Sequence, residues 1–147
     1  MISAIDAYNA MLKDTVGPRM RELGFRGSGG VYTRPDPDYF IRVGFQKSVY
    51  GSRQHVKFTL NLSAISKAQW EHARTDRTNL PKEPAANTFY GLEHWQRRIN
   101  LLMPAQERPP WWELTPQTDT PTLAREVLLA IERYALPAID GVVGAAR

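Results

Sequence analysis

Apolar residues recur at helical spacing near the start of the chain, at Ile5, Tyr8, Leu12, Val16 and Leu23. This spacing predicts an amphipathic helix that buries one stripe of side chains. Ser3, followed three residues later by Asp6, predicts that the helix begins there. Gly17-Pro18 predicts an interruption, because proline lacks a backbone donor, and Gly24 is typical of the residue that ends a helix.

Past the glycine cluster at residues 27–30 the apolar period changes to two, which predicts β-strands. We expect strands at Val31 to Arg34, Tyr39 to Lys47 and Val56 to Ile65, with a proline-rich turn between the first two. The strand from Val56 alternates most clearly between apolar and polar side chains. Such alternation favours an antiparallel sheet with one covered face, because buried parallel strands are apolar throughout.

The pattern weakens after the third strand. Ser66 predicts the start of a short helix through Ala73, and residues 75–90 are polar enough to indicate a long loop. A fourth strand is expected within residues 95–103. The stretch from residue 104 to 121 holds five prolines, which predicts a rigid, extended connector without regular structure, and it carries Trp111-Trp112.

The last helix has the clearest boundaries. Thr120 is its expected N-cap and Pro121 its first residue, while Leu136-Pro137 predicts its interruption. One apolar stripe contains Leu123, Val127, Ile131, Tyr134 and Ala135. The sequence therefore predicts an α+β domain over residues 1–147, an antiparallel sheet of about four strands with one face covered by an N-terminal and a C-terminal helix.

Composition limits the class of protein. A chain of 147 residues with 42% hydrophobic residues is the size of one ordinary globular domain. The chain has no cysteine, which excludes disulfides, thiol catalysis and thiolate metal sites. No stretch approaches the ~18–20 consecutive apolar residues of a membrane span, and Met1 to Tyr8 does not resemble a secretion signal. We therefore expect a cytoplasmic protein with no membrane partner.

Charge favours anionic partners only mildly. Lysine and arginine number 19 against 15 acidic residues, which gives a net charge of +4 and a pI near 9.6. Basic residues are spread along the chain, with local pairs such as Arg97-Arg98, and never form the run of about 5–8 that is typical of nucleic-acid patches.

Several segments, in order and spacing, resemble one bacterial family, the domain of unknown function 4304. They are Leu23-Gly24-Phe25, Phe45-Gln46-Lys47-Ser48, Phe58-Thr59-Leu60-Asn61-Leu62, Arg98-Ile99, Trp111-Trp112-Glu113-Leu114 and Leu136-Pro137. The chain departs from this pattern at Asn100, where a small residue, often glycine, is expected. The resemblance implies a family without an assigned activity; it supports the α+β class and implies no catalytic residues.

The polar side chains of the central strands are the first candidate binding site. Alternation places them together on one sheet face, which we call the polar face: Arg42, Gln46, Lys57, Thr59, Asn61 and Ser63. These side chains combine amides with two cations, which suits a peptide, a protein partner or a small anionic ligand. An ordinary solvated face is the alternative.

Trp111 and Trp112 are the second candidate. Because they are adjacent, we expect at least one to pack at the edge of the core while its neighbour faces the other way. An exposed tryptophan on a proline-fixed backbone would also suit an interface or ligand site. Both residues are therefore kept as candidate ligand-binding residues.

Catalytic and metal-binding patterns are missing from the sequence. His55, His72 and His94 lack the short spacings that bring two ligands to one metal, and no nucleophile or phosphate-loop motif occurs. We therefore expect no cofactor, and a non-enzymatic binding module for a protein or small-molecule partner. The alternative is a nucleic-acid-binding protein with a basic surface, and an enzyme that uses an unrecognised carboxylate or histidine comes third.

Overall fold

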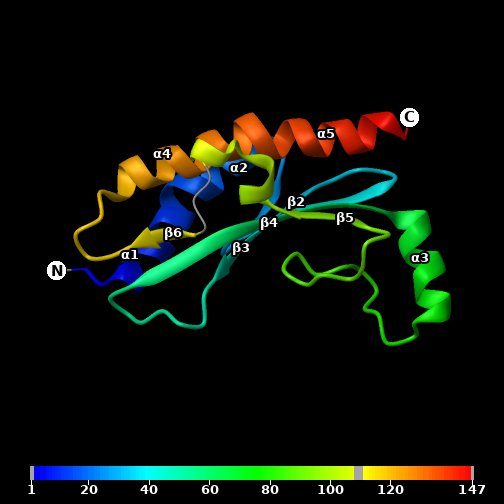
Figure 1. Ribbon diagram of the computed structural model, residues 1–147, viewed down its shortest axis with the longest axis horizontal. Coiled ribbons are helices and arrows are strands. Elements are labelled where there is room, and N and C mark those ends of the chain that lie inside the picture. The colour runs from blue at the N-terminus through cyan, green and yellow to red at the C-terminus, as the bar shows by residue number, and fades with distance from the viewer. Residues whose placement is uncertain (1, 108–110, 147) are drawn as a thin grey trace.

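The computed structural model describes residues 2–107 and 111–146, which form an α+β fold around a six-stranded sheet (Figure 1). The strands are β1 (Arg26–Ser28), β2 (Val31–Arg34), β3 (Tyr39–Lys47), β4 (Val56–Ser66), β5 (Trp95–Arg98) and β6 (Trp112–Leu114). Strands β1 to β5 lie side by side in chain order, and β6 pairs with the start of β4. Every pairing is antiparallel, as the alternation predicts.

Two long helical segments cover one face of the sheet, as predicted (Figure 1). The first consists of α1 (Ala4–Met11), the π-helical turn η1 (Leu12–Val16) and α2 (Gly17–Glu22). The second consists of α4 (Thr120–Ala130), the π-helical turn η4 (Ile131–Ala135) and α5 (Leu136–Ala145). Each π-helical turn ends shortly before a proline, Pro18 or Pro137. Since proline cannot donate the α-helical hydrogen bond, a wider turn accommodates it, and the predicted interruptions take this form.

The main core lies between these helices and the sheet. Along β3 and β4 the buried apolar side chains alternate as predicted, and those facing the helices include Val43, Phe45, Phe58 and Leu60. The Phe58 ring is central: its centroid lies 5.2 Å from that of Tyr8 and 5.9 Å from that of Phe45.

The polar face of the sheet carries a partial cover that the sequence did not predict. Helix α3 (Lys67–Asp76) follows β4 directly, and residues 77–94, which we call the excursion, then run back across this face (Figure 1). A small second core holds them, formed by Ile65, Trp70 and Leu80. Trp70 Nε1 donates hydrogen bonds to the carbonyls of Pro81 and Lys82, at 3.2 and 3.1 Å.

Local boundaries agree with most predictions. Ser3 and Ser66 cap their helices, accepting hydrogen bonds from the amides of Asp6 and Gln69 at 3.1 and 3.2 Å. The last helix begins one residue earlier than expected, at Thr120, because Asp119 rather than Thr120 is its N-cap.

The predicted fourth strand is shorter than expected. β5 ends at Arg98 and gives way to the 3₁₀ turn η2 (Ile99–Leu102). The prediction that residues 104–121 lack regular structure is wrong for two parts, η3 (Ala105–Glu107) and β6. β6 pairs with β4 because residues 112–114 contain no proline and keep their backbone donors. Within the described residues, no helix is long and apolar enough to cross a bilayer.

Candidate functional site

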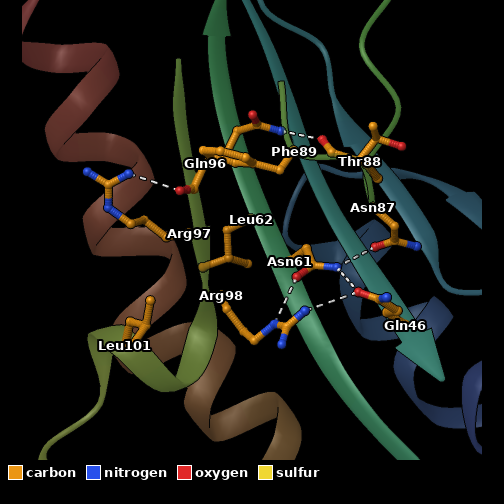
Figure 2. Close-up of a pocket in the computed structure, with 11 residues that line it drawn as sticks. Gln46, Asn61, Leu62, Asn87, Thr88, Phe89, Gln96, Arg97, Arg98 and Leu101 are labelled. Carbon is orange, nitrogen blue, oxygen red and sulfur yellow. Dashed lines mark hydrogen bonds between the residues drawn. The ribbon is translucent and has the colours of Figure 1, made fainter. Parts of the chain in front are cut away.

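A cavity of about 320 Å³ lies on the polar face, between the sheet and the excursion (Figure 2). Its walls come from β3, β4 and β5, from residues 86–89 of the excursion and from η2. The site therefore joins a rigid sheet to a loop that the small second core holds in place. Because regular strands fix their side-chain directions, this arrangement can hold polar groups in defined positions.

Side-chain amides form a connected network at the centre of the cavity. Asn61 Nδ2 donates to Gln46 Oε1 at 2.6 Å and to Asn87 Oδ1 at 2.9 Å. Arg98 donates from Nε to Asn61 Oδ1 at 3.4 Å and from Nη2 to Gln46 Oε1 at 3.5 Å. Since a guanidinium can only donate, the Asn61 and Gln46 oxygens must face Arg98, which fixes how the amides are oriented.

Arg98 is the cation of this network. Its guanidinium carbon lies 5.2 Å from the centroid of the Trp111 ring, in cation–π contact. No carboxylate of the described residues lies within 4 Å of it, and none of the residues lining the cavity is acidic. Arg97 points the other way (Figure 2), and its guanidinium lies over Trp95, beside the main core. The pair Arg97-Arg98 is therefore divided between the two faces of the sheet.

The excursion is attached to the sheet on both sides of the cavity. Arg42 donates to the carbonyl of Pro84 and pairs with Glu83 Oε1 at 2.7 Å. Gln96 on β5 accepts from the Tyr90 amide at 2.9 Å and donates to the Thr88 carbonyl at 2.7 Å. These four bonds join the middle of the loop to two strands.

Gly44 allows the loop to approach closely. A Cβ atom at this position would lie 2.4 Å from Asn87 Oδ1 and 2.8 Å from Ala86 Cβ, closer than real atoms pack. A glycine inside a strand commonly marks such an approach of another backbone or a ligand. Here it lets the excursion place Asn87 against Asn61.

The predicted polar-face residues separate into three groups. Gln46 and Asn61 line the cavity. Arg42 anchors the excursion in a neighbouring groove, and Lys57 lies 3.4 Å from Glu113, beside β6. Thr59 and Ser63 are only 1% and 2% exposed.

The two tryptophans diverge, as the sequence predicts for neighbours. Trp112 is buried in the main core, where its ring stacks on Phe58 with centroids 5.7 Å apart. Trp111 is only partly buried and lies under the Arg98 guanidinium. Of the two, Trp111 is therefore the one connected to the cavity, through Arg98.

Sequence reasoning missed Asn87, Phe89, Gln96 and Leu101, and left the direction of Arg98 open. The excursion has no periodicity, so nothing in its pattern places its residues over the sheet. One signal was available: Gly44 interrupts the polar side of β3, which indicates a close neighbour.

A second cavity, of about 500 Å³, lies beside α3 and is lined in part by His72, Asp76 and His94. His94 is 3% exposed, and its ring nitrogens have no hydrogen-bond partner among the described residues. Glu93 Oε1 lies 3.7 Å from His94 Nε2. Over the described part of the chain, no three histidine or acidic side chains are arranged to hold a metal ion.

Comparison with curated proteins and with solved structures finds no match to this chain. A comparison with family models does find one, and its range contains all six segments that carry the resemblance, from Leu23 to Pro137. The chain therefore belongs to the family described as Domain of unknown function (DUF4304), whose model matches residues 16–141.

Proposed function

We propose that this protein is a non-enzymatic binding module, and that the cavity on its polar face receives a protein or small-molecule partner. The observation that carries the proposal is the network of Gln46, Asn61, Asn87 and Arg98 around an open cavity. Its side chains are held in place before any ligand arrives, which lowers the entropic cost of binding. The proposal keeps the cytoplasmic location that the sequence predicts.

The chemistry of the lining supports binding over catalysis. The described residues that line the cavity are amides, arginines, apolar side chains and one threonine. General acid–base catalysis needs a group that titrates near the operating pH, and a nucleophile needs an adjacent base. The lining offers hydrogen bonds, the positive charges of Arg97 and Arg98, and apolar contact, which are the elements of recognition.

Affinity capture tests the proposal. The wild-type protein should retain a partner from a lysate of the source organism, and the double variant Gln46→Ala, Asn61→Ala should lose it. The matched control is Asn9→Ala, Gln54→Ala, which removes two exposed amides outside the cavity. Thermal unfolding of all three proteins separates lost binding from lost folding. Equal capture by the cavity variant and the control would contradict the proposal.

Nucleic-acid binding is the competing function, and the same experiment tests it. Arg97 and Arg98 lie on opposite faces of the sheet, and the excursion covers part of the polar face, so the basic residues do not form one stripe. Nuclease-sensitive capture, with affinity that falls steeply between roughly 50 and 200 mM salt, would favour this function instead.

A further inference from the structure

We propose that the cavity recognises a carboxylate attached to an apolar group, with Arg98 and Gln46 as the anion-binding residues. This inference rests on the proposed function and adds the chemical class of the ligand. Three observations carry it: which hydrogen-bonding groups the network leaves unused, the missing counter-charge for Arg98, and the apolar side chains at the cavity rim.

The amide oxygens of the network are already engaged. Gln46 Oε1 accepts from Asn61 and Arg98, Asn61 Oδ1 accepts from Arg98, and Asn87 Oδ1 accepts from Asn61. Gln96 Oε1 accepts from the Tyr90 amide. All four amide oxygens lining the cavity therefore have a protein donor.

The remaining groups are donors. Gln46 Nε2 and Arg98 Nη1 make no hydrogen bond within the described part of the chain, and Figure 2 shows both amino groups without a dashed line. An arginine cannot accept, and each amide oxygen already accepts at least one hydrogen bond, so the groups with no partner at all are best matched by a ligand that accepts hydrogen bonds. The network is therefore complementary to an acceptor.

The charge of Arg98 further restricts the ligand to an anion. Its guanidinium is partly buried, stacks on Trp111 and makes only long bonds of 3.4 and 3.5 Å to neutral amides. Charge-assisted bonds to carboxylates are typically about 2.7–2.9 Å, so these amides do not replace a counter-ion. An anionic ligand would supply that ion inside a cavity partly shielded from water, where charge pairing is stronger.

A carboxylate fits better than a phosphate. Of the two lining arginines only Arg98 points toward the amide network, and its guanidinium neutralises one negative charge, whereas a phosphate carries up to about two at neutral pH. Arg98 Nη1 and Gln46 Nε2 are both unused donors, and the planar guanidinium matches a planar acid.

The rim supplies the apolar half of the ligand. Phe89 is 64% exposed and Leu101 is 61% exposed, and both line the cavity, on the excursion and on η2. An aromatic or branched aliphatic group of the ligand would cover them and remove apolar surface from water. The cavity, at about 320 Å³, is the size of a small-molecule site.

The test is an NMR titration of the whole protein with 3-phenylpropionate, using 3-phenylpropanamide as the neutral control of the same shape. A ligand this small should bind with a Kd on the order of 1 mM. We expect 3-phenylpropionate to shift the side-chain amide signals of Gln46 and Asn61 and the Nε–H signal of Arg98. The control ligand 3-phenylpropanamide should bind at least tenfold more weakly, as judged from the same signals.

Two arginine variants locate the anion site. Arg98→Gln should weaken binding of the acid by about tenfold or more, because a charged hydrogen bond is lost. Arg26→Gln removes an exposed arginine on β1, at the opposite edge of the sheet, and should leave binding unchanged. The inference would be overturned if 3-phenylpropionate and 3-phenylpropanamide bound with equal affinity, or if Arg98→Gln bound the acid as tightly as the wild type. Tighter binding of phenyl phosphate than of 3-phenylpropionate would also overturn it.

A titration with a short peptide distinguishes the two sources of the carboxylate. Acetyl-Gly-Gly-Phe with a free C-terminus is titrated beside its C-terminal amide, which controls for the charge. If the peptide acid binds more tightly than 3-phenylpropionate, the ligand is the C-terminus of a chain; if it binds more weakly, the ligand is a free small acid. If neither acid binds while the capture experiment still depends on Gln46 and Asn61, the ligand class is wrong and the binding function stands.

Discussion

The Arg98 guanidinium lies over the Trp111 ring at 5.2 Å, which connects the end of β5 to the residue just before β6. Both strands pair with the same edge of β4, β5 with residues 61–64 and β6 with residues 56–58, so the contact bridges the gap between them. It holds Arg98 from one side while Asn61 and Gln46 accept its hydrogen bonds on the other. A single arginine thus joins the Trp-bearing connector to the cavity.

The two tryptophans should differ sharply when replaced. Trp112→Ala should lower the free energy of unfolding by about 3–5 kcal/mol, because it empties a core position stacked on Phe58. Trp111→Ala should cost about 1 kcal/mol or less, since it removes one partly exposed cation–π contact, yet it should weaken ligand binding. Urea unfolding of both variants measures the difference, and equal costs would contradict the assigned positions.

Gly44 should be intolerant of a side chain. Gly44→Ala places a Cβ 2.4 Å from Asn87 Oδ1, so the excursion must move, at a cost of about 1–3 kcal/mol. Amide hydrogen exchange at residues 85–88 should become faster. Gly141→Ala, in α5 where an added Cβ would meet no described atom outside its own helix turn within 4 Å, is the matched control and should stabilise by about 0.5–1 kcal/mol. Unchanged exchange in the Gly44 variant would show that the loop does not lie on this strand.

Arg42 should act as an anchor of the excursion. Arg42→Met removes its bonds to Pro84 and Glu83 and leaves a backbone carbonyl without its donor, which should cost about 1–3 kcal/mol. Arg125→Met removes an exposed arginine on α4 whose one hydrogen bond within the described residues goes to Thr122, and should cost less than about 0.5 kcal/mol. Thermal unfolding compares the stability of the two variants. An equal loss of stability in both would contradict the role of Arg42 as an anchor of the excursion.

Alkaline pH should destabilise the fold through Tyr8. Burial raises the pKa of the Tyr8 hydroxyl above its ordinary value, and the nearby Tyr32 adds to the effect. A raised pKa in the folded state gives stability that is complete below the unfolded value of about 10 and is lost as pH rises above it. The melting temperature should therefore fall above about pH 10, and Tyr8→Phe should reduce this fall. A pH dependence identical to that of the wild type would contradict the burial of this hydroxyl.

The sequence predicts the parts of the fold that are periodic. The alternation in β3 and β4 gives the core face, and Ser3 and Ser66 mark helix starts correctly, because caps and periodicity are local signals. β1 and β6 escaped prediction because each has only three residues, too few to show a period.

The sequence predicts the strand residues of the candidate site but not its loop residues. Gln46 and Asn61 follow from strand alternation. Asn87 reaches the cavity through the excursion, whose path depends on the packing of Leu80 against Ile65 and Trp70. Arg98 could not be oriented because β5 is followed at once by η2, which ends the alternation. Long-range packing, rather than local preference, assembles the site.

Photo-crosslinking from the rim of the cavity tests the central claim most directly. p-Benzoylphenylalanine is placed at Phe89, 64% exposed on the cavity, or at Leu129, 53% exposed on α4 and outside it. Each protein is irradiated in lysate of the source organism, and adducts are identified by intact mass spectrometry. The account predicts an adduct at Phe89 that disappears in the Gln46→Ala, Asn61→Ala background and is missing at Leu129. The same adducts at both positions, or adducts at Phe89 that persist in the double variant, would contradict it.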